Sequence, residues 1–129
     1  MNKIVADTNV IISSILTPCG KPAEIMQKFY NNKLQICYNQ YILDEYKKVL
    51  KYPKLNIAKA KQKEIIKIIK EKGIIIVPNI STIMLPDESD RIFYDTAKEA
   101  NAILITGNIK HFPKTDFIKT PAVYLEYIN

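Results

Sequence analysis

Short apolar runs alternate along this chain with longer stretches in which apolar residues recur every three or four positions. The short runs predict strands that are covered on both faces, at residues 3–7, 34–38, 73–77 and 102–106. The longer stretches predict amphipathic helices at residues 9–16, 21–31, 39–51, 58–72 and 88–101, and "TPAVYLEYI" predicts a last apolar piece with a helical tail. Strands that alternate with helices are typical of a parallel sheet with helices on both sides. We therefore expect an α/β fold.

The composition is that of a globular domain. The chain has 129 residues, of which 47% are apolar and 25% are charged. This length supports one core, so we expect a single domain over residues 1–129, and the apolar content excludes disorder. No apolar run is long enough to cross a bilayer, and the N-terminal "MNKIVADTNV" lacks the parts of a signal peptide. We therefore expect a cytoplasmic protein.

The net charge of +6 permits two interpretations. Excess lysine keeps many proteins soluble, and it also attracts polyanions such as nucleic acids. Charge alone does not separate the two. Five cations are candidates for phosphate contacts, although each also fits an ordinary solvated position: Lys47, Lys48, Lys51, Arg91 and Lys110.

Polar residues directly follow two of the predicted strands. Asp7 stands at the end of the first strand, with Thr8 and Asn9 after it. The strand "AILIT" ends at Thr106, and the turn that follows it brings Asn108 to the strand end. In such sheets, ligands bind beyond the carboxyl ends of the strands. Asp7 and Asn108 are therefore expected at one site, unless Asp7 serves only to cap the helix that follows.

A second carboxylate lies on the apolar face of the helix predicted at 88–101. At about 100° per residue, Asp90 falls in the middle of the apolar stripe, whereas three acidic residues fall on the opposite face and are expected in solvent. The stripe comprises Phe93, Tyr94, Ala97 and Ala100, and the opposite face carries Glu88, Asp95 and Glu99. A carboxylate directed at the core needs a charged partner or a metal. The alternative is a favourable charge at the helix N-terminus, with Asp87 as the N-cap.

The helix predicted at 39–51 offers a third carboxylate. Its inner face carries Ile42, Tyr46, Val49 and Leu50. Glu45 borders that face and Asp44 points the opposite way, so that only Glu45 can reach inward. An exposed ion pair between Glu45 and Lys48 explains the position equally well.

Asp7, Glu45, Asp90 and Asn108 together offer only oxygen ligands. Such a set suits Mg²⁺ or Mn²⁺, whereas zinc prefers His or Cys, and His111 has no plausible zinc partner nearby in the sequence. Magnesium held by carboxylates normally acts on phosphates. Together with a basic surface, this chemistry indicates cleavage of phosphodiester bonds.

The same residues carry a resemblance to a known family. The segments are "VADTNVIISSIL", "LDEYKKVLKYPK", "DESDRIFYDTAKEANAILITGN" and "KHFP", and they run in order over nearly the whole chain. The sequence resembles the PIN-domain family and, within it, the VapC-like toxin components of toxin–antitoxin systems. Each segment alone is a weak signal, but the N-terminal D-T-N-V, the later acidic helix and the strand ending in T-G-N form a fairly specific set.

The resemblance implies a metal-dependent endoribonuclease with a three-layer α/β/α fold around a central, mainly parallel sheet. The acidic residues of the family correspond here to Asp7, Glu45 and Asp90, which would hold one or two Mg²⁺ or Mn²⁺ ions. A water activated by the metal would attack the phosphorus of RNA in line, and a 5′-phosphate would result.

The resemblance also assigns supporting residues, with one departure. Thr8 and Asn9 would shape the pocket around Asp7, and Thr106 is similar to the hydroxyl residue that orients the cluster. The fourth acidic position is usually Asp in the family, and this chain has Asn108. An amide oxygen can bind a metal but brings no charge, which argues against a tightly held second metal ion. A catalytically weakened PIN-like RNA-binding module is therefore the alternative.

Partners follow from the resemblance as well. It implies RNA as the substrate, a small antitoxin that covers the acidic pocket, and a homodimer. The apolar residues Ile11, Ile12, Ile15 and Leu16 would suit a groove for such a partner. A helix that faces the core shows the same spacing, so these residues also fit a core position.

Overall fold

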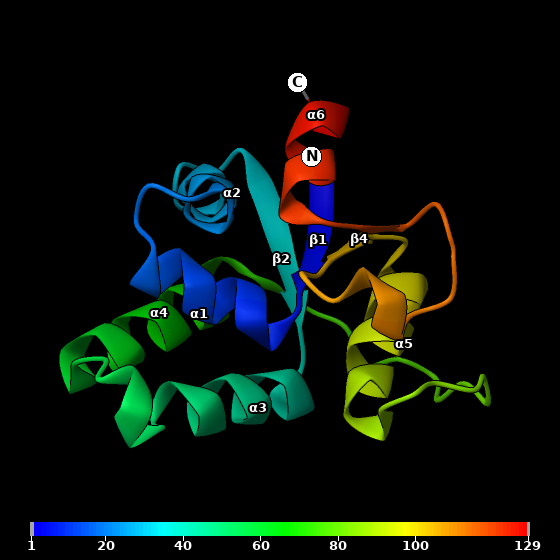
Figure 1. Cartoon of the computed structure of the whole chain (residues 1–129), viewed down its shortest axis with the longest axis horizontal. Helices are drawn as coiled ribbons and strands as arrows, with labels where there is room; N and C mark the ends of the chain where they lie inside the picture. The colour runs from blue at the N-terminus through cyan, green and yellow to red at the C-terminus, as the bar shows by residue number, and fades with distance from the viewer. Residues whose placement is uncertain (1, 129) are drawn as a thin grey trace.

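The structure, a computed structural model, describes residues 2–128 and contains a central sheet surrounded by helices (Figure 1). Five strands form the sheet in the order β3-β2-β1-β4-β5, and every neighbouring pair is parallel. The strands are β1 (Asn2–Ala6), β2 (Leu34–Tyr38), β3 (Ile74–Ile75), β4 (Ile103–Ile105) and β5 (Ile118–Lys119). The predicted parallel sheet is confirmed, with β1 at its centre.

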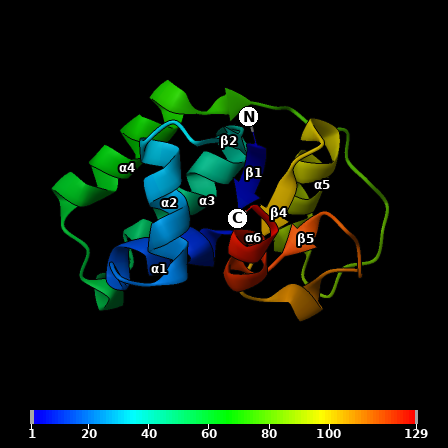
Figure 2. The same cartoon turned by 90° about the horizontal axis from the view of Figure 1, so that it is seen from above.

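Helices cover both sides of this sheet. They are α1 (Thr8–Leu16), α2 (Lys21–Tyr30), α3 (Gln40–Leu50), α4 (Lys59–Lys72), α5 (Arg91–Ala100) and α6 (Pro121–Ile128), with short 3-10 helices η1 (Pro53–Leu55), η2 (Glu88–Asp90) and η3 (Ile109–His111). Helix α5 packs on β1, β2 and β4, and α2 and α4 pack on β2. Figure 2 shows α5 on the side of the sheet opposite α2 and α4. This is the expected three-layer α/β/α arrangement.

None of the helices in the described part of the chain has the length and apolar character needed to span a bilayer.

Strand β1 is buried at the centre of the core. Ile4, Val5 and Ala6 are fully buried, which explains why this strand is apolar at consecutive positions rather than at alternate ones. The Tyr46 hydroxyl on α3 donates a hydrogen bond of 2.5 Å to the carbonyl oxygen of Ala6. This bond satisfies a buried hydroxyl and attaches α3 to the carboxyl end of β1.

Helix α1 buries most of the apolar stripe that we considered for a partner. Ile11 and Ile12 belong to the core, Ile15 is half-buried, and Leu16 at the helix end is 49% exposed. The interpretation of this stripe as core is therefore confirmed for Ile11 and Ile12.

The edges of the sheet differ from the prediction. The strand predicted at 73–77 pairs only through β3, after which the amide of Ile76 makes one more hydrogen bond, to the carbonyl oxygen of Tyr38. Pro78 has no amide with which to continue the pairing. The sequence does not predict β5, because its two residues lie in the polar stretch "TDFIKT", which contains no apolar run of strand length.

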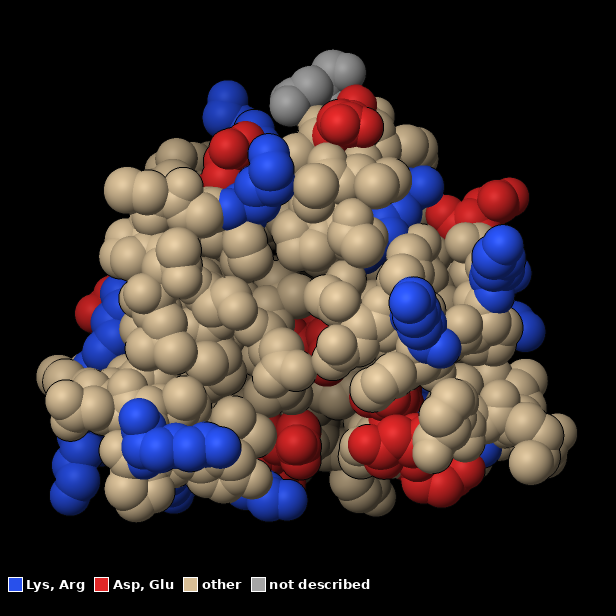
Figure 3. All heavy atoms as spheres, in the orientation of Figure 1, with Lys and Arg blue, Asp and Glu red and all other residues tan. Residues whose placement is uncertain are grey.

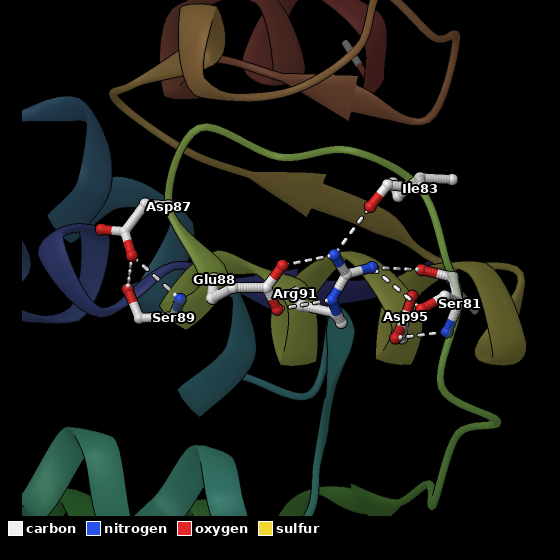
Figure 4. A network of polar contacts seen from close by, with 7 residues as sticks. All are labelled: Ser81, Ile83, Asp87, Glu88, Ser89, Arg91 and Asp95. Atoms are coloured by element: carbon white, nitrogen blue, oxygen red, sulfur yellow. Dashed lines mark hydrogen bonds and ion pairs between the residues drawn. The ribbon is translucent and has the colours of Figure 1, made fainter.

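An extended segment at residues 76–87, which we call the strap, is held along α5 (Figure 4). Arg91 donates hydrogen bonds to the carbonyl oxygens of Ser81, over 2.9 Å, and of Ile83, over 2.7 Å. The same guanidinium makes two hydrogen bonds to the Glu88 carboxylate, and the Arg91 side chain is only 16% exposed. Arg91 therefore fits neither of the two positions considered for it, a phosphate contact or a solvated surface charge, because its donors bind the strap and Glu88.

The strap also corrects the prediction for Asp95. We expected Asp95 on the solvent face of α5, but it is 4% exposed, and its Oδ2 accepts a hydrogen bond from the amide of Ser81 over 3.0 Å. Glu99, one turn further along, accepts from the amide of Asn79 over 3.3 Å and remains exposed. Helical angles locate an apolar face, but they do not reveal a polar segment that covers the opposite face.

Candidate metal centre

Asp7 lies where the strand order of the sheet reverses. Its amide donates a 2.9 Å hydrogen bond to the carbonyl oxygen of Ile105, which extends the pairing of β1 with β4 beyond the end of β1. The Asp7 side chain is 6% exposed. In open parallel sheets this reversal point forms the crevice in which ligands bind. The structure thus places Asp7 at the carboxyl edge, as its position in the sequence predicts.

A chain of hydrogen bonds orients the Asp7 carboxylate. The fully buried Thr106 hydroxyl donates to Asp7 Oδ2 over 2.8 Å. The backbone amide of Asn108 in turn donates to Thr106 Oγ1 over 2.9 Å. Because the amide N–H donates a hydrogen bond to the hydroxyl oxygen, the hydroxyl's own hydrogen is free to point toward Asp7. Thr106 therefore has the geometry needed to orient this carboxylate.

Capping of α1 does not account for Asp7. Asp7 occupies the N-cap position, but its side chain makes no cap hydrogen bond. Burial raises the pKa of the Asp7 carboxyl, and the hydrogen bond from Thr106 opposes that rise only in part. A nearby cation would offset the cost of burying the charge.

Asp90 is buried at the junction of two helices. The helix predicted from residue 88 begins as η2, and Asp90 ends η2 and precedes α5 without making a cap hydrogen bond itself. Asp87 provides the predicted N-cap by accepting the amide of Ser89 over 2.9 Å. The Asp90 side chain is 13% exposed, and its buried Oδ2 has no hydrogen-bond partner. Burial, followed by repulsion from Asp7 and then Asp87, raises the pKa of Asp90 to about 6.

His111 lies in the same cluster and was not predicted there. Its Nδ1 is 3.5 Å from Asp90 Oδ2, and its positive charge when protonated lowers the pKa of both Asp90 and Asp7. The turn η3 brings it to this place, with the amide of His111 donating to the carbonyl oxygen of Asn108 over 2.9 Å. Its sequence signal is its position three residues after Asn108, in the turn that follows β4.

Glu45 and Asn108 are the other two predicted ligands. Glu45 is half-buried on α3, and the Asn108 side chain is exposed while its amide contacts Thr106. Among residues 2–128, no three side chains of Asp, Glu, His or Cys are close enough together to surround a metal ion. The structure therefore places Asp7 and Asp90 close enough for their charges to repel each other. It does not place Glu45 in a tight ligand set with them.

The two residues after Asp7 have different surroundings. Thr8 is 6% exposed, and its buried Oγ1 has no hydrogen-bond partner. Asn9 is exposed. Thr8 thus belongs to the buried surroundings of Asp7, whereas Asn9 is accessible to a ligand.

Acidic side chains gather around a hollow on one face of the molecule (Figure 3). The hollow lies between α3 and α5, near the carboxyl end of β1. Basic side chains lie mainly toward the rim of this face. The charge distribution therefore favours a cation in the hollow and a polyanion against the rim.

Comparison with known proteins assigns the family. The chain matches the family model of the PIN domain over residues 3–110. It is 34% identical over 109 residues to an uncharacterized protein of Methanocaldococcus jannaschii, and the alignment covers 82% of this chain and 70% of that protein. Its fold is similar to a chain in the crystal structure of VapBC2 from Rickettsia felis bound to a DNA fragment from their promoter, with a TM-score of 0.54, 16% identity, and coverage of 84% of this chain and 89% of that chain. The chain therefore belongs to the PIN-domain family.

Proposed function

We propose that this protein is a divalent-metal-dependent endoribonuclease and the toxin of a toxin–antitoxin pair. The observation that supports the proposal best is the pair of Asp7 and Asp90, two largely buried carboxylates that repel each other, one with a buried oxygen that has no hydrogen-bond partner. Such a pair is costly without a cation. Membership of the PIN-domain family and the net charge of +6 direct the proposal toward nucleic acid.

The residues present fit Mg²⁺ or Mn²⁺. Mg²⁺ prefers oxygen ligands, and it usually keeps several waters while one or two carboxylates and the phosphates of the substrate complete its octahedron. Asp7 and Asp90 would supply the carboxylates. Glu45 on α3 and the amide oxygen of Asn108 would contact the hydration shell of the ion. This arrangement requires no third carboxylate in the tight cluster.

Each residue of the cluster has a distinct task in the proposed reaction. The ion would supply an activated water and stabilise the charge that develops on the phosphate during hydrolysis. Thr106 holds the Asp7 carboxylate in one orientation through its 2.8 Å hydrogen bond, and Thr8 and Asn9 shape the pocket beside it. The imidazole of His111, 49% exposed, is accessible to an approaching phosphate.

The toxin role is proposed by analogy. The chain shares its fold with a chain of the VapBC2 structure, at 16% identity. By that analogy, we propose an antitoxin protein as a partner, a homodimer as the assembly, and the cytoplasm as the location.

Cleavage of single-stranded RNA by the purified protein tests the proposal. Cleavage is measured with Mg²⁺, with Mn²⁺ and with a chelator. Asp7→Asn is expected to lower the rate on the order of 100-fold or more, because the ion loses a charged ligand. Asp116→Asn, at an exposed position, is the matched control and should cleave like the wild type. Wild-type rates in Asp7→Asn would rule out the assignment, provided that circular dichroism shows both variants folded.

One observation favours a second candidate, a catalytically weakened PIN-like module that binds RNA. Asn108 brings no charge to a position that is usually acidic in the family. The same cleavage experiment, with RNA binding measured beside it, distinguishes the two candidates. A binding module would bind RNA equally with metal and with chelator, and no cleavage would occur even in Mn²⁺.

A further inference from the structure

A groove between α3 and α4 gathers much of the positive charge of the chain. It has a volume of about 1000 Å³ and is lined by Lys47 of α3, by Lys51 directly after α3, and by Lys59, Lys63, Lys67 and Lys70 of α4. Among the described residues that line the groove, Glu71 is the single acid. In Figure 3, basic side chains border the lower left of the face, where Figure 1 shows α3 and α4.

The lysines of α4 form one row. They follow one another at intervals of four, four and three residues, so that they point to one side of the helix within about 80°. The row covers about 17 Å of the helix axis. Lys47 lies in the last turn of α3, Lys51 directly follows that helix, and both line the same groove. A ligand with repeated negative charges would therefore meet cations along both walls.

The lining favours a polyanion over a protein helix. Leu50 is 1% exposed and Ile66 is 9% exposed, so they offer little of the apolar surface that an amphipathic helix needs as an anchor. The described lining residues include no aromatic side chain on which a base could stack. The aliphatic stems of the lysines supply much of the exposed lining, and the ammonium groups at their ends can bind phosphates as point charges.

We propose that this groove binds the sugar–phosphate backbone of the RNA substrate at a distance from the bond that is cleaved. The inference rests on the proposed function, because it takes the polyanion to be RNA. Helix α3 carries Glu45, a predicted ligand, together with Lys47 of the groove, and Lys51 directly follows the helix. One rigid element thus links the two surfaces. Phosphate contacts carry no sequence information, so the groove contributes affinity and orientation rather than selection of a sequence.

Two triple variants test the groove. The groove variant combines Lys51→Gln, Lys63→Gln and Lys70→Gln, which remove exposed charges from both walls. Lys67 is kept because it already pairs with a glutamate over 3.8 Å. The control variant combines Lys21→Gln, Lys98→Gln and Lys114→Gln, which remove the same charge from exposed positions outside the groove.

The readout is binding rather than cleavage. Fluorescence anisotropy of a labelled single-stranded RNA is recorded in chelator at several salt concentrations. The groove variant should bind at least about tenfold more weakly than the control variant, and its slope of log K against log salt should be shallower by about 2, since each lost phosphate contact removes about 0.7. Equal affinities of the two variants would overturn the proposal.

A second probe separates RNA from an acidic protein segment. Poly-L-glutamate of the same total charge as the RNA is titrated in the same assay. Weaker binding of this polypeptide than of RNA supports the proposal. Tighter binding that is lost in the groove variant would assign the groove to an acidic protein instead.

The outcome for the groove is independent of the outcome for the nuclease. RNA binding that depends on the groove, without any cleavage by the wild type, would support the groove and contradict the nuclease. Cleavage that requires Asp7, with equal RNA binding by the groove and control variants, would support the nuclease and contradict the groove.

Discussion

At the scale of single residues, Asp7 and Asp90 share a cluster but differ in their surroundings. Asp7 accepts a hydrogen bond from the Thr106 hydroxyl, whereas the buried Oδ2 of Asp90 has no such bond. The pKa of Asp90 is raised to about 6, chiefly by burial. Without a cation, the charge on Asp90 therefore costs the folded protein stability at neutral pH.

Asp90→Asn should stabilise the metal-free protein. The folded-state pKa of about 6 lies above the usual value of 3.8, so the folded protein binds the proton more tightly than the unfolded chain. The resulting stability is present at low pH and is lost as the pH rises through about 6. With allowance for solvent screening, the variant should gain about 1 kcal/mol, a few degrees in Tm, at about pH 8, and the gain should shrink as the pH falls and vanish only below the usual pKa of 3.8. Thermal unfolding in chelator measures this.

Asp116→Asn is the control. Because Asp116 is exposed, this substitution should leave Tm unchanged at both high and low pH. A lower Tm of Asp90→Asn at about pH 8 would mean that Asp90 stabilises the start of α5 by its charge. That result would remove the main support for a cation at this site.

At the scale of the element, α5 shows what periodicity predicts and what it does not. Its predicted apolar face is correct, since Phe93, Tyr94, Ala97 and Ala100 are all buried. Asp95 is buried as well, because its cover is the polar backbone of the strap, and hydrophobic patterns do not detect such a cover. Helix ends are also set by local hydrogen bonds, and the Asp87 cap starts η2 rather than a continuous helix.

The residues of the candidate site, like those of α5, were predictable from the sequence only in part. Asp7 and Thr106 follow from the rule that strand ends meet at one edge, and Asp90 follows from its position in the middle of the predicted apolar stripe. His111 was missed because η3 is a turn too short to show any periodicity. Glu45 was predicted from an angle, and an angle gives the direction of a side chain but not the distance that it has to bridge.

Arg91→Lys should loosen the strap. Lysine keeps the charge but cannot reproduce the fork of donors that binds two strap carbonyls and Glu88. Loss of these hydrogen bonds should lower the free energy of local opening by about 2 kcal/mol, which corresponds to roughly 30-fold faster amide exchange in residues 79–87. Hydrogen–deuterium exchange measures this. Lys98→Arg, on an exposed part of the same helix, should exchange like the wild type, and unchanged exchange in Arg91→Lys would contradict the role of Arg91.

At the scale of the whole molecule, a fully parallel sheet directs all its carboxyl ends to one edge. Asn39 follows β2 at this edge and is 3% exposed. Its Oδ1 accepts the amide of Ile42 in α3, and its Nδ2 donates to the carbonyl oxygen of Ile76 and to the hydroxyl of Thr96 in α5. One amide thus joins α3 and α5, between which the acidic hollow lies, and attaches the strap to both.

Asn39→Ala should destabilise the protein by about 3 kcal/mol. The variant loses a helix cap and leaves two acceptors without their donor, the buried Thr96 hydroxyl and the partly buried carbonyl of Ile76. Urea denaturation measures the loss of free energy of unfolding. Asn31→Ala, at an exposed position, should change it by less than about 0.5 kcal/mol. A cost below about 1 kcal/mol for Asn39→Ala would show that the three elements are held together by other contacts.

The hydrogen bond from Thr106 to Asp7 also has a consequence for biosynthesis. Thr106 follows Asp7 by 99 residues, and it comes into place only when β4 pairs with β1. Asp7 is synthesised early, but the growing chain cannot complete the cluster until β4 has emerged from the exit tunnel of the ribosome. Chains that stop before β4 cannot form this hydrogen bond. The nuclease proposed above would therefore gain its complete cluster only at the end of synthesis, when β4 pairs with β1.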